Sequence, residues 1–169
     1  NVIYEICNEP NGGTSWNTIR SYAGKVIRTI RKYDKNAVIL VGTPNWSQDV
    51  DVAAEKPLKG YKNIMYTLHF YAGTHGSWLR DKAQKALDKG LPLFVSEFGI
   101  SDASGNGNLN KTEGTAWIRF LNRNKISYVG WSLSNKAESS ALIKSTVNKT
   151  TGWTNKDLTD WGRWLKSRF

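Results

Sequence analysis

Residues 2–10 read VIYEICNEP, an apolar run that ends in a polar turn carrying Glu9. Residues 91–99 read LPLFVSEFG, repeat the pattern and carry Glu97. Apolar runs of this length are typical of buried parallel strands, and we predict that each carboxylate lies where its strand gives way to a loop. Open α/β sheets and βα barrels hold their catalytic residues at that edge, so the two glutamates are candidate catalytic groups.

Strand-like and helix-like segments alternate along the whole chain. Apolar runs predict five strands, at residues 2–7, 37–42, 63–71, 91–96 and 126–131. Amphipathic segments predict helices at about 15–33, 50–55, 77–89 and 111–124, and a terminal helix from about Leu158. Repeated βα units indicate an α/β fold with a parallel sheet and right-handed crossovers. No linker divides the chain, so we expect a single domain over residues 1–169, with a flexible loop at 104–108.

Composition excludes several classes of protein. The chain has 169 residues, 39% hydrophobic and 22% charged, as in an ordinary globular domain. Its net charge of +10 could indicate a nucleic-acid partner, but the basic residues are spread along predicted helices without a recognition motif, so we expect none. No apolar run approaches the ~18 residues of a membrane span. The single cysteine, Cys7, lies inside the first apolar run and is expected to be a small core residue.

Each predicted strand ends in residues suited to binding and cleaving a sugar. They are Asn8 and Glu9, Trp46, His69 and Tyr71, Glu97, and Trp131. A retaining glycosidase needs two carboxyl groups about 5–5.5 Å apart, one acid and one nucleophile. Indole rings stack on sugar faces, and imidazole or phenol groups can orient a carboxylate. Alone, each residue is more often structural, but their joint occurrence favours a site. The two histidines lack metal-ligand spacing, and no phosphate loop or nucleophile elbow is present.

At five stretches the sequence resembles bacterial endo-β-1,4-glucanases of glycoside hydrolase family 5. They are ICNEPNG (6–12), GTPNWSQ (42–48), LHFYAGTHG (68–76), SEFGISDASG (96–105) and GWSLSNKAESS (130–140). The motifs occur in the family's order and cover nearly the whole chain. The resemblance implies a partial TIM (β/α)8 barrel, with about five parallel βα units matching strands four to eight.

The resemblance also implies a role for each matching residue. Glu9 matches the proton donor and general base, and Glu97 the nucleophile. Asn8 matches the residue that binds the sugar 2-hydroxyl, and Trp131 the aromatic platform at the cleavage point. His69 and Tyr71 match residues that flank the catalytic subsite. The positions that line neighbouring subsites are matched by Trp46, Ala103, Ser104, Lys136, Ala137 and Glu138.

The chain departs from the family pattern in one respect: the resemblance starts in the fourth strand of the family's barrel. The first three βα units have no counterpart, nor have the arginine, histidine and tyrosine groups that they carry. An open parallel sheet leaves unpaired strand edges and an uncovered apolar face. We therefore expect self-association or a complementary fragment that covers the open barrel.

The resulting functional prediction is a secreted, extracellular endo-acting hydrolase that cleaves internal β-1,4-glucosidic bonds of cellulose and related β-glucans. It would act by double displacement with retention of configuration. It needs no cofactor and no metal, because the two carboxyl groups supply both the proton and the nucleophile. Two alternatives stay open at this point: a truncated barrel that binds β-glucan with little or no catalysis, and a folded fragment without activity.

Overall fold

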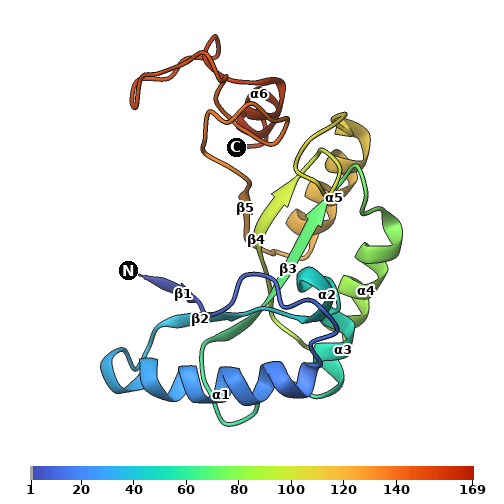
Figure 1. Ribbon diagram of the computed structural model, residues 1–169. Helices are drawn as coiled ribbons and strands as arrows, with labels where there is room; N and C mark the ends of the chain where they lie inside the picture. Colours follow the sequence, from blue (N-terminus) through green and yellow to red (C-terminus); the bar gives the residue numbers. More distant parts are fainter. Residues whose placement is uncertain (1) are drawn as a thin grey trace. The chain divides into compact units, whose positions relative to one another are not determined.

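The structure is a computed structural model that describes residues 2–169 (Figure 1). Its strands follow the apolar runs: β1 (Ile3–Glu5), β2 (Val38–Val41), β3 (Ile64–Tyr71), β4 (Leu93–Gly99) and β5 (Tyr128–Gly130). They form a five-stranded sheet in the order β1-β2-β3-β4-β5. The β1–β2 and β2–β3 pairs are parallel, with Tyr4 opposite Ile39 and Leu40 opposite Met65. The predicted parallel α/β sheet is confirmed.

The helices also begin and end close to the predicted positions. They are α1 (Trp16–Tyr33), α2 (Pro44–Ser47), α3 (Val50–Glu55), α4 (Ser77–Asp88), α5 (Lys111–Arg123) and α6 (Asp160–Lys166). The Ser15 side chain accepts a hydrogen bond from the Thr18 backbone and so caps α1. Only α2 was not predicted. Among the described residues, no helix has both the length and the apolar character that crossing a membrane requires.

The chain divides into two compact units, and the division passes through β3 and β4. The first unit comprises the chain up to His69 together with Ser77–Ser96. The second comprises Phe70–Gly76 and Glu97–Phe169. The expectation of a single domain stays a prediction.

In the first unit, the apolar face of α1 packs over the sheet. Its buried residues recur at helical spacing and include Ile19, Ala23 and Ile27. From the sheet, Ile39 and Val41 are fully buried. In the same unit α3 packs against α4 (Figure 1), and an ion pair from Lys82 to Asp49, with 2.5 Å between Nζ and Oδ1, joins α4 to the start of α3.

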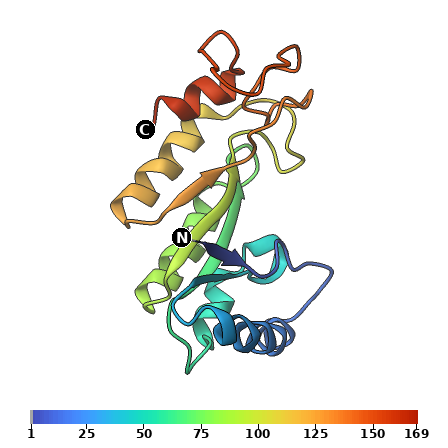
Figure 2. The same cartoon turned by 90° about the vertical axis from the view of Figure 1, so that its left-hand side faces the viewer.

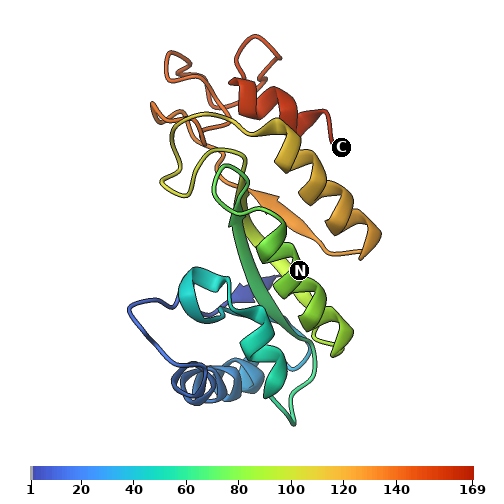
Figure 3. The same ribbon diagram turned by 90° about the vertical axis from the view of Figure 1, so that its right-hand side faces the viewer.

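In the second unit, the core is a cluster of aromatic rings. Phe70 stacks on Trp117 with 3.9 Å between ring centroids, and on Phe98 with 5.0 Å. Trp161 of α6 meets the edge of Phe98 at 5.4 Å. The α5 and α6 helices lie side by side in views from two opposite sides (Figures 2 and 3), with Gly114 of α5 facing the Trp164 ring. These rings fix the end of β4 that carries the second glutamate.

Two strand predictions need correction. The first apolar run is not a buried strand, because Val2 and Ile3 are 60% and 52% exposed. The reason is its position: β1 is an edge strand with β2 as its only strand neighbour in the described sheet. The fourth strand is longer than predicted and continues to Gly99, so that Glu97 lies inside β4 rather than after it. Cys7 is half-buried instead of belonging to the core.

Candidate active site

In the first unit, the turn that carries Glu9 is fixed against the end of β2. The Trp46 amide donates to the Pro10 carbonyl at 3.0 Å, and the Ser47 hydroxyl donates to the Asn8 carbonyl at 3.1 Å. Gly42 makes this packing possible, because a Cβ there would lie 2.8 Å from both the Cys7 carbonyl oxygen and Pro10 Cδ. The backbone on both sides of Glu9 is therefore held in place by β2 and the turn that follows it.

The carboxyl group of Glu9 meets His69, which projects from β3. The distance between Glu9 Oε1 and His69 Nδ1 is 2.8 Å. The His69 side chain is only 3% exposed, whereas that of Glu9 is 25% exposed. His69 Nε2 lies 2.9 Å from the Ser96 hydroxyl, on its other side. The imidazole ring is therefore held at both nitrogens, and Glu9 keeps part of its carboxyl group accessible to a substrate.

In the second unit, Glu97 of β4 meets Tyr71 of β3. The Tyr71 phenol donates to Glu97 Oε1 at 2.8 Å, and both residues are buried. The ring reaches this position because Gly99 has no side chain. A Cβ on Gly99 would lie 2.7 Å from Tyr71 Cδ1 and 2.8 Å from Cε1.

The backbone around Tyr71 is fixed as well. Its amide donates to His75 Nδ1 at 2.8 Å, and the Trp117 indole donates to the His75 carbonyl at 2.7 Å. Because Nδ1 of His75 accepts, its proton is on Nε2. His75 is therefore part of the structural support of Tyr71. Hydrogen bonds therefore hold both the main chain and the side chain of Tyr71, one of the residues predicted at the strand ends.

The two predicted stacking residues present half-exposed indole rings. Trp46 is 48% exposed and Trp131 is 45% exposed. The backbone of Trp131 is fixed between its neighbours: its amide donates to the Phe98 carbonyl at 2.8 Å, and its carbonyl accepts from the Trp161 indole at 2.7 Å. A fixed backbone with an exposed ring suits a platform for the CH face of a sugar.

The remaining predicted residues lie in two loops of the second unit. Lys136, Ala137 and Glu138 line a hollow of about 400 Å³. The ammonium group of Lys136 lies 2.6 Å from Glu138 Oε2, and this contact holds the pKa of Glu138 below its usual value. Ala103 and Ser104 are exposed in the loop after β4. The Ser104 hydroxyl and amide both donate to Asp102, which lowers the pKa of that carboxyl group.

The structure therefore gathers the predicted residues into two groups. The first unit holds Asn8, Glu9, Trp46 and His69, and the second holds Tyr71, Glu97, Ala103, Ser104, Trp131, Lys136, Ala137 and Glu138. Sequence reasoning missed Glu5 and Ser96, which lie beside His69 Nε2, and Thr67, which donates to Glu5. Their one signal was the presence of polar residues inside otherwise apolar strands.

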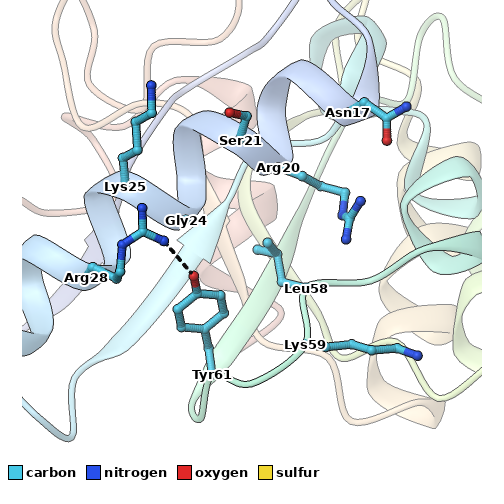
Figure 4. Close-up of a pocket in the computed structure, with 9 residues that line it drawn as sticks. All are labelled: Asn17, Arg20, Ser21, Gly24, Lys25, Arg28, Leu58, Lys59 and Tyr61. Atoms are coloured by element: carbon cyan, nitrogen blue, oxygen red, sulfur yellow. Dashed lines mark hydrogen bonds between the residues drawn. The ribbon is translucent and has the colours of Figure 1, made fainter.

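A separate pocket of about 460 Å³ lies between α1 and the segment that carries Leu58, Lys59 and Tyr61 (Figure 4). Its lining includes the basic residues Arg20, Lys25, Arg28 and Lys59, and Arg28 donates to the Tyr61 hydroxyl at 3.2 Å. No carboxylate lines it. This pocket lacks the carboxyl pair that glycoside hydrolysis uses, and none of the predicted site residues belongs to it.

Comparison with known proteins gives consistent matches. The family model described as Cellulase (glycosyl hydrolase family 5) matches residues 1–137. An endoglucanase from Clostridium saccharobutylicum is 54% identical over 167 residues, which cover 98% of this chain and 37% of the relative. A solved structure from Cytophaga hutchinsonii is 49% identical with a TM-score of 0.96, and the match covers 99% of this chain and 55% of that one.

A third match includes a bound oligosaccharide. The catalytic domain of Thermobifida fusca endoglucanase Cel5A, solved in complex with cellotetraose, is 33% identical with a TM-score of 0.90. The match covers 99% of this chain and 57% of that domain. The chain thus spans less than two thirds of the length of each of these relatives. The similarity confirms the predicted fold class, a partial (β/α) barrel of the TIM type.

Proposed function

Because the chain belongs to the cellulase family, glycosyl hydrolase family 5, we propose that it carries the catalytic pair of an endo-acting β-1,4-glucanase. The observation that carries the proposal is the different partner of each glutamate. Glu9 meets an imidazole ring, which can accept or donate a proton, and Glu97 accepts from a phenol. An acid that must later act as a base needs the first kind of partner, and a nucleophile needs the second.

The reaction proceeds in two displacements. In the first, Glu9 gives its proton to the glycosidic oxygen while a Glu97 oxygen bonds to the anomeric carbon, and the bond to the leaving sugar breaks. In the second, Glu9 takes a proton from water, the resulting hydroxide bonds to the anomeric carbon, and the Glu97 carboxylate leaves. Two inversions at one carbon retain the β configuration.

The substrate is a β-1,4-linked glucan, and the other predicted residues bind it. Asn8 offers its amide to the 2-hydroxyl, and Trp131 and Trp46 stack on successive sugar rings. Lys136, Ala137 and Glu138 line a neighbouring subsite, as do Ala103 and Ser104. Two of the relatives compared, from Clostridium saccharobutylicum and Thermobifida fusca, are named endoglucanases, which favours hydrolysis over binding without catalysis. A polysaccharide of this kind is degraded outside the cell, so the protein acts as a secreted enzyme.

Association with a second copy or a complementary fragment stays a prediction. The exposed apolar side chains of Val2 and Ile3, on an edge strand, support it. Light scattering at micromolar concentration tests it: a strictly monomeric chain with a normal melting transition would count against association.

The catalytic pair is tested by hydrolysis of soluble carboxymethyl cellulose. Glu9→Gln and Glu97→Gln should each abolish the release of reducing ends, because the amide can neither transfer the proton nor form the glycosyl ester. Glu55→Gln is the matched control, since Glu55 is an exposed residue paired with Lys89 on the surface. The proposal is overturned if the wild-type chain turns over its substrate and either active-site variant keeps that activity. Proton NMR of the first product should show the β anomer.

A further inference from the structure

His69 connects Glu9 to a second carboxyl group, Glu5, through the hydroxyl of Ser96. The distances are 2.8 Å from Glu9 Oε1 to His69 Nδ1, 2.9 Å from His69 Nε2 to Ser96 Oγ, and 2.5 Å from Ser96 Oγ to Glu5 Oε1. All four residues belong to the first unit. Thr67 also donates to Glu5 Oε1, at 3.1 Å.

The donor and acceptor in each of these hydrogen bonds follow from counting protons. A carboxylate only accepts, and a serine hydroxyl has one proton to donate. Because Ser96 gives that proton to Glu5, its oxygen can only accept from His69. Nε2 of His69 must therefore carry a proton. The proton in the bond between His69 Nδ1 and Glu9 is then a second one, in addition to the proton on Nε2.

We propose that Glu5 acts through Ser96 to hold one proton on His69 Nε2, so that the His69–Glu9 pair holds two protons and can give one away. Glu5 and Ser96 are positioning residues in this scheme, since neither touches the substrate. The inference rests on the proposed role of Glu9 as the acid. Without the fixed proton on Nε2, the pair would keep a single proton, bound to Nδ1 beside an ionised Glu9, which is the wrong state for an acid.

Two further observations support the scheme. His69 is almost fully buried, whereas the Glu5 side chain is 30% exposed, so Glu5 can keep its charge partly in water. Burial and the nearby Glu5 carboxylate raise the pKa of the Cys7 thiol, so this neighbour stays neutral at pH 7 and adds no charge to the cluster. The negative charge that fixes the proton on Nε2 therefore comes from Glu5.

The test is long-range ¹H–¹⁵N NMR of the imidazole rings, which reports the protonated nitrogens without requiring turnover. The chain has two histidines, and His75 serves as an internal reference because its Nδ1 accepts from a backbone amide. We expect a protonated Nε2 on His69 in the wild-type chain. Glu5→Ala and Ser96→Ala should each leave the proton on Nδ1. In Glu5→Ala the Ser96 hydroxyl becomes free to donate to Nε2, and in Ser96→Ala the Nε2 proton loses its acceptor.

Thr67→Val is the matched control. It also removes a hydroxyl that donates to Glu5, but this hydroxyl has no bond to His69, so the His69 pattern should not change. The proposal is overturned if wild-type Nε2 carries no proton, or if Glu5→Ala and Ser96→Ala both keep the wild-type pattern while the His75 signals show a folded chain. Failure of the proposed function would appear separately, as Glu9→Gln and Glu97→Gln variants that still hydrolyse glucan.

Turnover gives a second measurement. An aryl cellobioside with a dinitrophenolate leaving group needs little help from an acid, whereas a glucan needs full protonation. Ser96→Ala should therefore lower kcat/KM on the glucan by about 10²-fold or more, in the range of general acid catalysis, and much less on the aryl substrate. Equal losses on the two substrates would contradict a role through the proton of Glu9.

Discussion

The contact between Gly99 and Tyr71 allows a quantitative prediction for Gly99→Ala. The new Cβ would lie 2.7 Å from Tyr71 Cδ1, whereas ordinary contacts begin at 3.4 Å, so the ring must retreat by about 0.7 Å. Such a shift directed along the ring would stretch the 2.8 Å bond from the phenol to Glu97 to about 3.5 Å, at the limit of a hydrogen bond. Overpacking costs about 1–3 kcal/mol, and a lost hydrogen bond to a charged group about 1.5–3 kcal/mol.

Urea unfolding followed by tryptophan fluorescence measures this cost. We expect Gly99→Ala to lower the free energy of unfolding by about 2–4 kcal/mol, between the separate contributions and their sum. Gly76→Ala is the matched control in the same unit, because its added Cβ would meet nothing closer than Glu113 Oε1 at 3.8 Å. That variant should stay within about 1 kcal/mol of wild type.

A double-mutant cycle identifies the cause. In a Tyr71→Ala background the ring is absent, so the additional cost of Gly99→Ala should fall below about 1 kcal/mol. If Gly99→Ala costs the same in both backgrounds, or costs less than about 0.5 kcal/mol in the wild-type chain, the steric reasoning is wrong.

Three further predictions concern other parts of the chain. Gly42→Ala should destabilise the first unit by about 1–3 kcal/mol and lower turnover, because the new Cβ would lie 2.8 Å from the Cys7 carbonyl oxygen and from Pro10 Cδ, beside Glu9. An unchanged urea unfolding curve would contradict this. Ser15→Ala should cost about 1 kcal/mol by removing the cap of α1, with loss of helical circular dichroism at a lower temperature as the readout. Lys149 and Thr154 lower the pKa of Asp157 from 3.8 to about 2, so its contribution to stability is present above pH 4 and is lost as the pH falls through about 2; Asp157→Asn should remove this part of the acid dependence.

The elements that the sequence predicted well are those with a clear period. The apolar face of α1 repeats at helical spacing, and β3 is a long, mainly apolar run, so both are found within one residue of the predicted bounds. The short α2 could not be predicted. Its residues Asn45, Trp46 and Ser47 have φ values of 55–58°, a conformation rare for side chains of this kind. The bond from the Trp46 amide to Pro10 and the contact of Ser47 with Asn8 hold it, and neither follows from local sequence.

The candidate site follows the same rule. Glu9, Glu97, His69 and Tyr71 could be predicted because each stands at or near a strand end, where a polar residue interrupts an apolar run. The role of Glu5 and Ser96 could not, because the bond between them joins residues 91 positions apart. A glutamate inside an apolar strand indicates a polar partner, but it does not identify the partner.

The two glutamates differ in what their partners allow, and this difference supports the roles proposed for them. A phenol beside Glu97 can only donate to a carboxylate oxygen at neutral pH, so the bond from Tyr71 requires an accepting oxygen, as a nucleophile provides. An imidazole beside Glu9 accepts or donates according to which nitrogen carries a proton. The acid state of Glu9 therefore depends on the far side of the His69 ring, where Ser96 and Glu5 determine the proton on Nε2. Exchanging the two proposed roles would place the acid beside a donating phenol, which stabilises the ionised form of a carboxyl group.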